Sequence, residues 1–264
     1  MVKIALQRYK KSNQYHICNV KNQHNKDLNW LFSIRFDIEI NEMQTKITHI
    51  YLMPGMAANP TIFENIVLPE DRYKIHWLEW KIPNQNETLQ AYAKRMSEEI
   101  KHDNSVLLGV SFGGMLAQEM SRFVILKKLF VVSSVKSHHE LPKRLKLLKY
   151  TKAYKILPTQ WIGNMDLLAK YAFGETIKKR VELYKKYLSF NDKVYLDWSI
   201  KQIVCWEQDK PHPDAIYIHG DKDLVFPHSC LGDCIIIKGG THIMILNKYK
   251  WFNENLPKLI AESS

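Results

Sequence analysis

The sequence lacks any apolar run long enough to cross a membrane, which takes about 20 residues. Its first residues, Met1 to Arg8, turn polar at once and contain no hydrophobic segment of the kind found in a secretory signal. Internal repeats and low-complexity tracts are also missing. We therefore expect no transmembrane segment and no leader, and a cytoplasmic protein.

Cysteine is scarce. The four cysteines are scattered along the chain, at Cys18, Cys205, Cys230 and Cys234. This scatter favours reduced thiols over a disulfide framework. Cys230 and Cys234 are four residues apart, but no second pair of ligands lies near them, so the spacing does not favour a zinc site.

The composition otherwise suits a folded protein of ordinary size. The chain has 264 residues, 45% of them hydrophobic, with 7 Trp, 13 Tyr and 10 Phe for a core. This length allows one large α/β domain with an insertion, or two small domains. The net charge of +11 favours an anionic partner: nucleic acid, a phospholipid surface, or an acidic substrate or carrier protein. No stacked-aromatic or helix-turn-helix pattern supports nucleic acid.

One short stretch carries a chemical motif. An apolar run over 106–110 leads into Gly109-Val110-Ser111-Phe112-Gly113, and an amphipathic segment over 115–123 follows. A strand, a sharp turn and a helix with serine at the apex form the nucleophile-elbow pattern. The glycines are needed because strand and helix backbones come close there. The same five residues could also form a glycine-rich turn whose serine has no catalytic role. Other motifs in the chain are needed to distinguish these two interpretations.

Strands and helices alternate along most of the chain. Apolar strands are predicted over 47–53, 73–80, 106–110, 129–134, 215–219 and 234–237, with helices beginning near 60, 89, 115 and 243. This alternation predicts a mainly parallel sheet with helices on both faces. It breaks after Val135, because residues 136–205 are mostly helical in pattern and contain no obvious strand.

Two further loops supply partners for the serine. Ser111 is a poor nucleophile near neutral pH and needs a base. His242 follows the last predicted strand, and Asp223 follows the strand before it. All three loops lie at the carboxyl edge of a parallel sheet, where active sites form. The chain order Ser111, Asp223, His242 is that of α/β-hydrolase triads.

Each partner has competitors in the sequence. Asp221 lies two residues before Asp223 and could accept the bond from the histidine or serve as a turn residue. His219 ends a predicted buried strand, which favours a packed or loop-bonded role. His228 follows Pro227 and fits an exposed position.

Acyl transfer also needs donors for the oxyanion. The first candidate is the backbone N–H of Phe112, directly after the serine. The second is the N–H of Met56 in the loop Pro54-Gly55-Met56, where Gly55 would let the backbone approach a substrate. An ordinary strand-to-helix loop is the alternative interpretation.

In matching order, these motifs resemble the α/β-hydrolase superfamily over about residues 47–260, and most of all its small uncharacterised bacterial members. The motifs are Pro54-Gly55-Met56, Gly109 to Gly114, His219-Gly220-Asp221-Lys222-Asp223 and Gly240-Thr241-His242. The resemblance implies a serine hydrolase fold with a helical cap, and it favours Asp223 because those members retain the second acidic position. Pro54-Gly55 departs from the commoner His-Gly. Serine at the elbow, instead of aspartate, argues against dehalogenase and epoxide hydrolase chemistry.

The resulting division has four parts. Residues 1–42 form an N-terminal extension or β-hairpin that the small members lack. Residues 43–135 form the first part of the α/β-hydrolase core, 136–205 form the cap insertion, and 206–264 form the second part of the core.

The insertion is rich in positive charge: residues 136–186 hold 13 basic against 4 acidic residues. These charges could guide an anionic substrate, contact anionic lipid or form a solvated face. Aromatic residues in and beside the insertion could line an acyl pocket or pack its helices: Trp161, Tyr171, Phe173, Tyr184, Trp198 and Trp206.

The sequence thus predicts a serine hydrolase that cleaves an ester or thioester of small to medium size through Ser111, His242 and Asp223. Met56 and Phe112 N–H groups would hold the oxyanion, with Gly55, Gly109 and Gly113 supporting the loops. This chemistry requires no metal and no cofactor. An acyltransferase or lyase on the same fold, or a non-catalytic protein whose basic cap docks an acidic partner, remain alternatives. The oligomeric state is not indicated.

Overall fold

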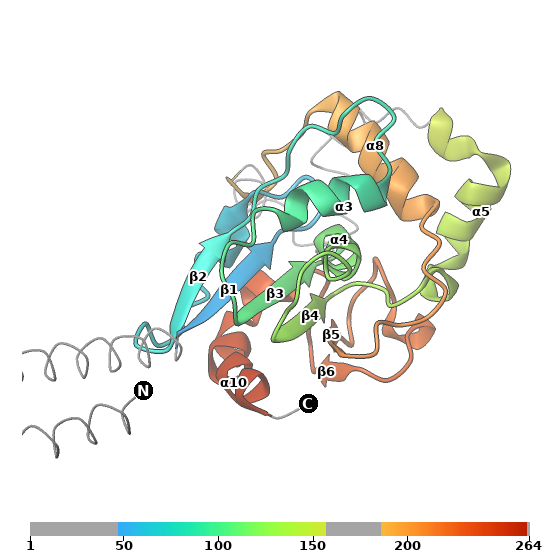
Figure 1. The fold of residues 1–264 in the computed structure, drawn as a ribbon. Coiled ribbons are helices and arrows are strands. Elements are labelled where there is room, and N and C mark those ends of the chain that lie inside the picture. The colour runs from blue at the N-terminus through green and yellow to red at the C-terminus, as the bar shows by residue number, and fades with distance from the viewer. Residues whose placement is uncertain (1–46, 157–185, 263–264) are drawn as a thin grey trace, which may run out of the picture. The chain divides into compact units, whose positions relative to one another are not determined.

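A computed structural model describes residues 47–156 and 186–262 (Figure 1). The predicted extension or hairpin over 1–42 lies outside these ranges, as do Trp161, Tyr171, Phe173 and Tyr184. The described chain forms a six-stranded sheet in the order β2-β1-β3-β4-β5-β6, and every neighbouring pair is parallel. The strands are β1 (Thr48–Met53), β2 (Tyr73–Trp77), β3 (Ser105–Val110), β4 (Lys128–Val132), β5 (Ala215–Gly220) and β6 (Ile235–Ile237). The predicted parallel α/β architecture is confirmed.

Helices cover both faces of this sheet. One face packs against α3 (Leu89–Ser97), α4 (Phe112–Met120) and α8 (Lys193–Val204), and the other against η1 (Pro60–Phe63), α9 (Met244–Asn247) and α10 (Tyr249–Ala261) (Figure 1). Alternate residues of β1 pack against the two helical layers, because successive side chains of a strand point to opposite faces of the sheet. Tyr51 and Met53 join the first layer, while Ile50 and Leu52 join the second. The central strands β1, β3 and β4 are therefore almost entirely buried on both faces.

Several element ends differ from the predictions. The segment after Asn59 is a single 3₁₀ turn, with Asn59 accepting a bond from the Thr61 amide. β4 ends at Val132 instead of Ser134, because Ser133 has a φ of 48° that no strand accommodates. The last helix is two helices, since Lys248 has a φ of −117° between α9 and α10. Between β4 and β5 the described chain holds η2 (His138–Glu140), α5 (Lys143–Thr151), η3 (Ala153–Lys155) and α8, with no strand.

The strand order creates a topological switch point at the carboxyl edge of the sheet. The chain passes from β1 to β2 on one side and then returns to place β3 on the other side of β1. Connections that leave in opposite directions open a crevice beyond the strand ends, and ligands bind there in open α/β sheets. Met53 of β1 pairs with Gly109 of β3, so the loops that follow these two residues face each other across the crevice. These are the loops of Met56 and Ser111.

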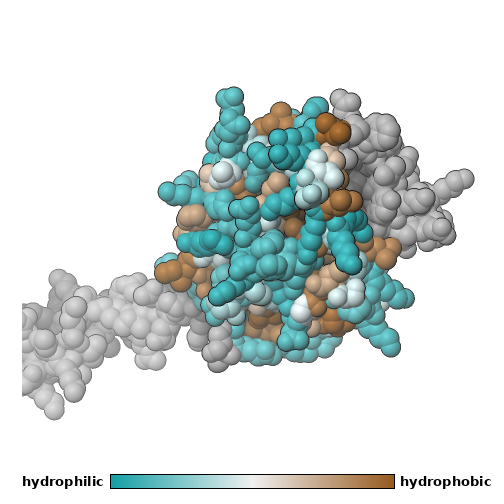
Figure 2. All heavy atoms as spheres, turned by 90° about the vertical axis from the view of Figure 1, so that its right-hand side faces the viewer, coloured by the Kyte–Doolittle hydropathy of each residue, from teal (hydrophilic) through white to brown (hydrophobic). Residues whose placement is uncertain are grey.

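The α5 side of the molecule is strongly basic at its surface. Lys143, Lys146 and Lys149 are exposed on α5, and so are Leu147 and Tyr150, which are 61% and 87% exposed. Figure 2 shows the visible part of this side as mainly hydrophilic with separate hydrophobic patches. Among the described helices, none combines the length and apolar character needed to span a membrane.

Candidate active site

Ser111 lies at a strained turn between β3 and α4. Its backbone has φ 55° and ψ −123°, a region that side-chain-bearing residues rarely adopt. The Ser111 amide donates to the Val132 carbonyl at 2.9 Å, and the Ser111 carbonyl accepts from the Gly114 amide at 2.8 Å. These bonds fix the turn to β4 on one side and to α4 on the other. The serine side chain is thereby held at the carboxyl edge of the sheet.

The glycines beside Ser111 are required by close backbone contacts. A Cβ on Gly109 would lie 2.2 Å from the Gly113 carbonyl oxygen, and a Cβ on Gly113 would lie 2.2 Å from the Pro54 carbonyl oxygen. Both distances are far below van der Waals contact, and the blocking atoms are backbone. Gly109 therefore lets the strand and helix backbones come close, as the sequence pattern predicts, and Gly113 lets the elbow approach the Pro54 loop.

Replacing Gly109 with alanine is expected to destabilise the protein by about 3 kcal/mol or more, because backbone must move to admit the new methyl group. Urea unfolding measures this loss. Gly232→Ala is the matched control, since its Cβ would meet only the ends of two side chains, Lys136 Nζ at 3.3 Å and Glu140 Oε1 at 3.7 Å. Equal stability of the two variants would contradict the crowding described here.

The structure brings Ser111, His242 and Asp223 into one hydrogen-bonded chain. The Ser111 Oγ lies 2.9 Å from His242 Nε2, and His242 Nδ1 lies 2.8 Å from Asp223 Oδ2. The three residues come from the loops after β3, β6 and β5 and are up to 131 positions apart in sequence. An aspartate on Nδ1 holds Nδ1 protonated and leaves the Nε2 lone pair toward the serine.

Asp223 is held ionised by its surroundings. Its side chain is fully buried, and Oδ1 accepts hydrogen bonds from the amides of Val225 (2.7 Å) and Phe226 (2.9 Å). Burial by itself raises the pKa of Asp223, but His242 and His219 outweigh it, and the net pKa lies well below the ordinary value of 3.8. Arg144 of α5 also donates to the carbonyls of Leu224 and Val225, which ties the acid loop to the insertion.

The competing residues occupy other positions. Asp221 Oδ1 accepts from the Gly239 amide at 2.6 Å and so braces the loop that precedes His242. His219 is buried, with Nε2 2.7 Å from the Phe226 carbonyl oxygen and 3.2 Å from Asp223 Oδ2. This is the loop-bonded position that the sequence favours for it. His228 is exposed.

The two amides expected to bind an oxyanion belong to Met56 and Phe112. Within the described part of the chain, the N–H groups of Met56 and Phe112 make no hydrogen bond. The carbonyl of the Gly55–Met56 peptide is fixed by two donors, the Trp80 indole N–H at 2.8 Å and the Ala58 amide at 3.1 Å. Because C=O and N–H of a trans peptide point in opposite directions, these bonds also set the direction of the Met56 N–H. No sequence pattern indicates this role of Trp80.

Aromatic side chains pack beside the elbow. The rings of Trp80 and Phe112 stack with centroids 5.1 Å apart, and Trp198 of α8 meets Phe112 edge-on at 5.8 Å. Trp198 is buried and donates to the Glu87 carbonyl, while Trp206 is buried and donates to the Glu119 carboxylate. Of the aromatics considered for an acyl pocket, these two therefore pack and hydrogen-bond inside the protein.

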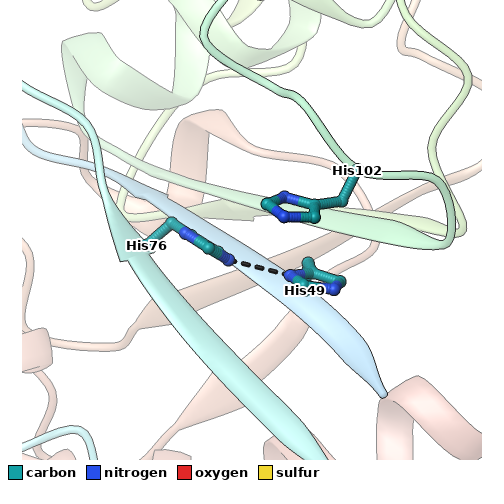
Figure 3. Close-up of side chains that lie close together, drawn as sticks. All are labelled: His49, His76 and His102. Carbon is teal, nitrogen blue, oxygen red and sulfur yellow. Dashed lines mark hydrogen bonds between the residues drawn. The ribbon is translucent and has the colours of Figure 1, made fainter. Parts of the chain in front are cut away.

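A second cluster of polar residues, which the sequence pattern does not reveal, lies on three other elements. His49 of β1, His76 of β2 and His102 before β3 gather with ring nitrogens within 4.8 Å of one another (Figure 3). The pKa of His76 is lowered to about 4, first by burial and then by His102, His49 and Lys74. The pKa of His49 is lowered as well, first by burial and then by His102 and Lys74. Among the described residues, neither Cys230 nor Cys234 belongs to a group that could hold a metal.

Comparison with known proteins establishes the fold. No family model and no curated protein matches the sequence. A bromoperoxidase from Bacillus anthracis is similar in structure, with 16% identity and a TM-score of 0.62 over 82% of this chain and 92% of the other. Esterases from Exiguobacterium antarcticum (17% identity, TM-score 0.53, 81% of this chain and 92% of the other) and Thermogutta terrifontis (13%, 0.56, 81% and 89%) are also similar. All three have the α/β-hydrolase fold, and so does this chain.

Proposed function

We propose that the protein is a serine hydrolase that cleaves an ester or thioester of small to medium size. The observation that carries this proposal is the hydrogen-bonded chain Ser111–His242–Asp223 at the crevice of the sheet, beside two amides that have no partner among residues 47–156 and 186–262. Nucleophile, base, orienting carboxylate and oxyanion donors are the complete set that acyl transfer needs. The esterases of similar structure share the fold and add support.

The chemistry follows from these positions. As the Ser111 Oγ attacks the carbonyl carbon, His242 Nε2 accepts the hydroxyl proton and becomes an imidazolium, which the Asp223 carboxylate stabilises. The carbonyl oxygen gains negative charge between the Met56 and Phe112 N–H groups. The intermediate collapses, and His242 gives the proton to the leaving alcohol or thiol. Water, deprotonated by His242, then attacks the acyl-enzyme and releases the acid with Ser111 restored.

The basic side of the molecule bears on the choice of substrate. Lysines of α5 and the Arg144 bonds to the loop of Asp223 place positive charge beside the acid loop. Long-range attraction then favours an acyl substrate that carries negative charge. Transfer of the acyl group to an acceptor other than water uses the same first half of the reaction and is the second candidate.

The test is turnover of a matched series of esters and thioesters by the full chain. The acyl chain is lengthened step by step, and each compound is made in a neutral and a carboxylate-bearing form. Release of free acid supports hydrolysis, and accumulation of a new ester when an alcohol is added supports acyl transfer. Folded protein that turns over no member of the series is inconsistent with the proposal and favours a binding protein.

Trp80 is expected to act as a positioning residue for this reaction. Trp80→Phe keeps an aromatic ring on Phe112 but removes the bond to the Gly55 carbonyl, so the Met56 amide loses part of its orientation. Loss of a complete oxyanion donor costs about 10²- to 10³-fold in kcat. We therefore expect roughly a tenfold lower kcat with little change in KM. Steady-state kinetics measures both, and a change in KM alone would contradict the assignment.

A further inference from the structure

The three-histidine cluster of His49, His76 and His102 lies at the opposite end of β1 from the crevice. His49 is the second residue of β1, and Met53, which leads into the Met56 loop, is the last. Four residues of strand span about 13 Å. His49 pairs with Ser105, the first residue of β3, whereas Ser111 follows the end of that strand. The cluster is therefore separate from the triad.

The sheet register places two of the rings side by side. Tyr51 pairs with His76, and His49 lies two residues before Tyr51, so all three side chains stand on the same face of the sheet. His49 Nδ1 and His76 Nε2 are 2.9 Å apart. His102 reaches them from the loop between α3 and β3, and its ring stacks on His49 with centroids 3.7 Å apart (Figure 3).

The surroundings orient the third ring. His102 Nδ1 lies 2.6 Å from the Tyr51 hydroxyl oxygen, which also accepts from the Lys101 amide at 3.0 Å. With His102 Nδ1–H donating to that oxygen, the Nε2 lone pair stays free. Ligating histidines characteristically donate their other ring N–H to an oxygen in this way, which fixes the tautomer. Among the described residues, His102 Nε2 has no hydrogen-bond partner.

From this geometry we propose a divalent transition-metal site formed by His49, His76 and His102. Three imidazole nitrogens suit Zn²⁺, Ni²⁺ or Cu²⁺, whereas Mg²⁺ and Ca²⁺ prefer oxygen ligands. Nitrogens bound to one tetrahedral Zn²⁺ at the usual bond lengths are about 3.3 Å apart. The His49–His76 pair at 2.9 Å is already close to that spacing. Binding replaces their mutual bond with two metal bonds and turns the His102 ring edge toward the ion.

The bound ion would join three separate pieces of chain. β2 is the edge strand of the described sheet and pairs only with β1. An ion held by His49, His76 and His102 links β2, β1 and the loop before β3. Any ion that binds only the folded state stabilises it by RT ln(1 + [ion]/Kd), so the stabilisation grows with the logarithm of the ion concentration. The site is thus a structural clamp, remote from Ser111.

The test is Zn²⁺ titration calorimetry on the full chain, after chelator treatment and removal of any affinity tag. We expect one equivalent to bind and the melting temperature to rise. His102→Ala should weaken binding by roughly 100-fold or more, since even outer-shell partners of ligands are worth 10- to 100-fold. Tyr51→Phe should weaken it by roughly tenfold through loss of the orienting bond.

Two matched variants make the result specific. His138→Ala/His139→Ala removes the other group of the described chain that could hold a metal, formed with Asp209, and should bind Zn²⁺ as the wild type does. Ser111→Ala should also bind it unchanged, because the triad is elsewhere. His49→Gln serves as a second ligand variant, and its melting temperature without metal checks its folding. Failure of wild type to bind, binding unchanged in folded His102→Ala and His49→Gln, or loss only in the His138/His139 variant would overturn the proposal.

Discussion

Ser111→Ala is expected to lower ester turnover by at least about 10³-fold and to leave the fold intact. The variant removes the only atom of the triad that bonds to the substrate, so no acyl-enzyme can form. Alanine differs from serine by one oxygen, and the strained backbone at φ 55° is the same for both residues. The residual rate would come from substrate binding and the oxyanion amides alone. Initial rates on the best ester of the series measure the effect.

Ser134→Ala is the matched control for this loss. Ser134 is a buried serine that lies against Gly114 of α4, and among the described residues its hydroxyl has no hydrogen-bond partner. Removing an unpaired buried hydroxyl is close to neutral or stabilising. Turnover by Ser134→Ala should therefore match the wild type. Similar rates for the Ser111 and Ser134 variants would show that the reaction occurs elsewhere.

Asp223→Asn should lower kcat by about 10³- to 10⁴-fold, because the asparagine would hold His242 in the wrong tautomer. The asparagine oxygen would take over the bonds from the Val225 and Phe226 amides, which turns its NH₂ group toward His242. Nδ1 must then accept, and Nε2 carries the proton and cannot take one from Ser111. The protein should still fold, because the side-chain shape is unchanged.

Asp221→Asn distinguishes this effect from general damage to the loop. Asp221 accepts one bond, from the Gly239 amide, and an asparagine oxygen can accept the same bond. We expect kcat within a few-fold of the wild type. Stopped assays across pH on both variants compare them directly. A larger loss in Asp221→Asn than in Asp223→Asn would mean that the acid has been assigned to the wrong residue.

The parallel sheet and the approach of Ser111, Asp223 and His242 could be predicted because their signals are local. Each of the three residues lies within five residues after the end of a short strand, and the loops that follow parallel strands meet at one edge of the sheet. The glycines of the elbow carry the same kind of local signal. The ends of the strands were harder to predict. β4 ends before Ser133 because Ser133 has a positive φ, and a serine in the sequence does not indicate a positive φ.

Other features depend on tertiary contacts that no spacing reveals. His49 and His76 are 27 residues apart and meet only because β1 and β2 pair in one register. The bond from Trp80 to Gly55 depends on where the chain turns after β2 ends at Trp77, three residues earlier than the predicted end. Burial of Trp198 and Trp206 likewise follows from the packing of α8 and the chain after it.

The most direct measurement of the central claim is labelling of the intact protein with a fluorophosphonate, followed by mass spectrometry of its peptides. Such a probe reacts with a serine only where a base and oxyanion donors activate it. We predict one label per chain, on the peptide that contains Ser111, with none in Ser111→Ala and strongly slowed labelling in Asp223→Asn. Folded protein that takes up no label, or takes it up at another serine, would contradict the assignment of Ser111 as the nucleophile.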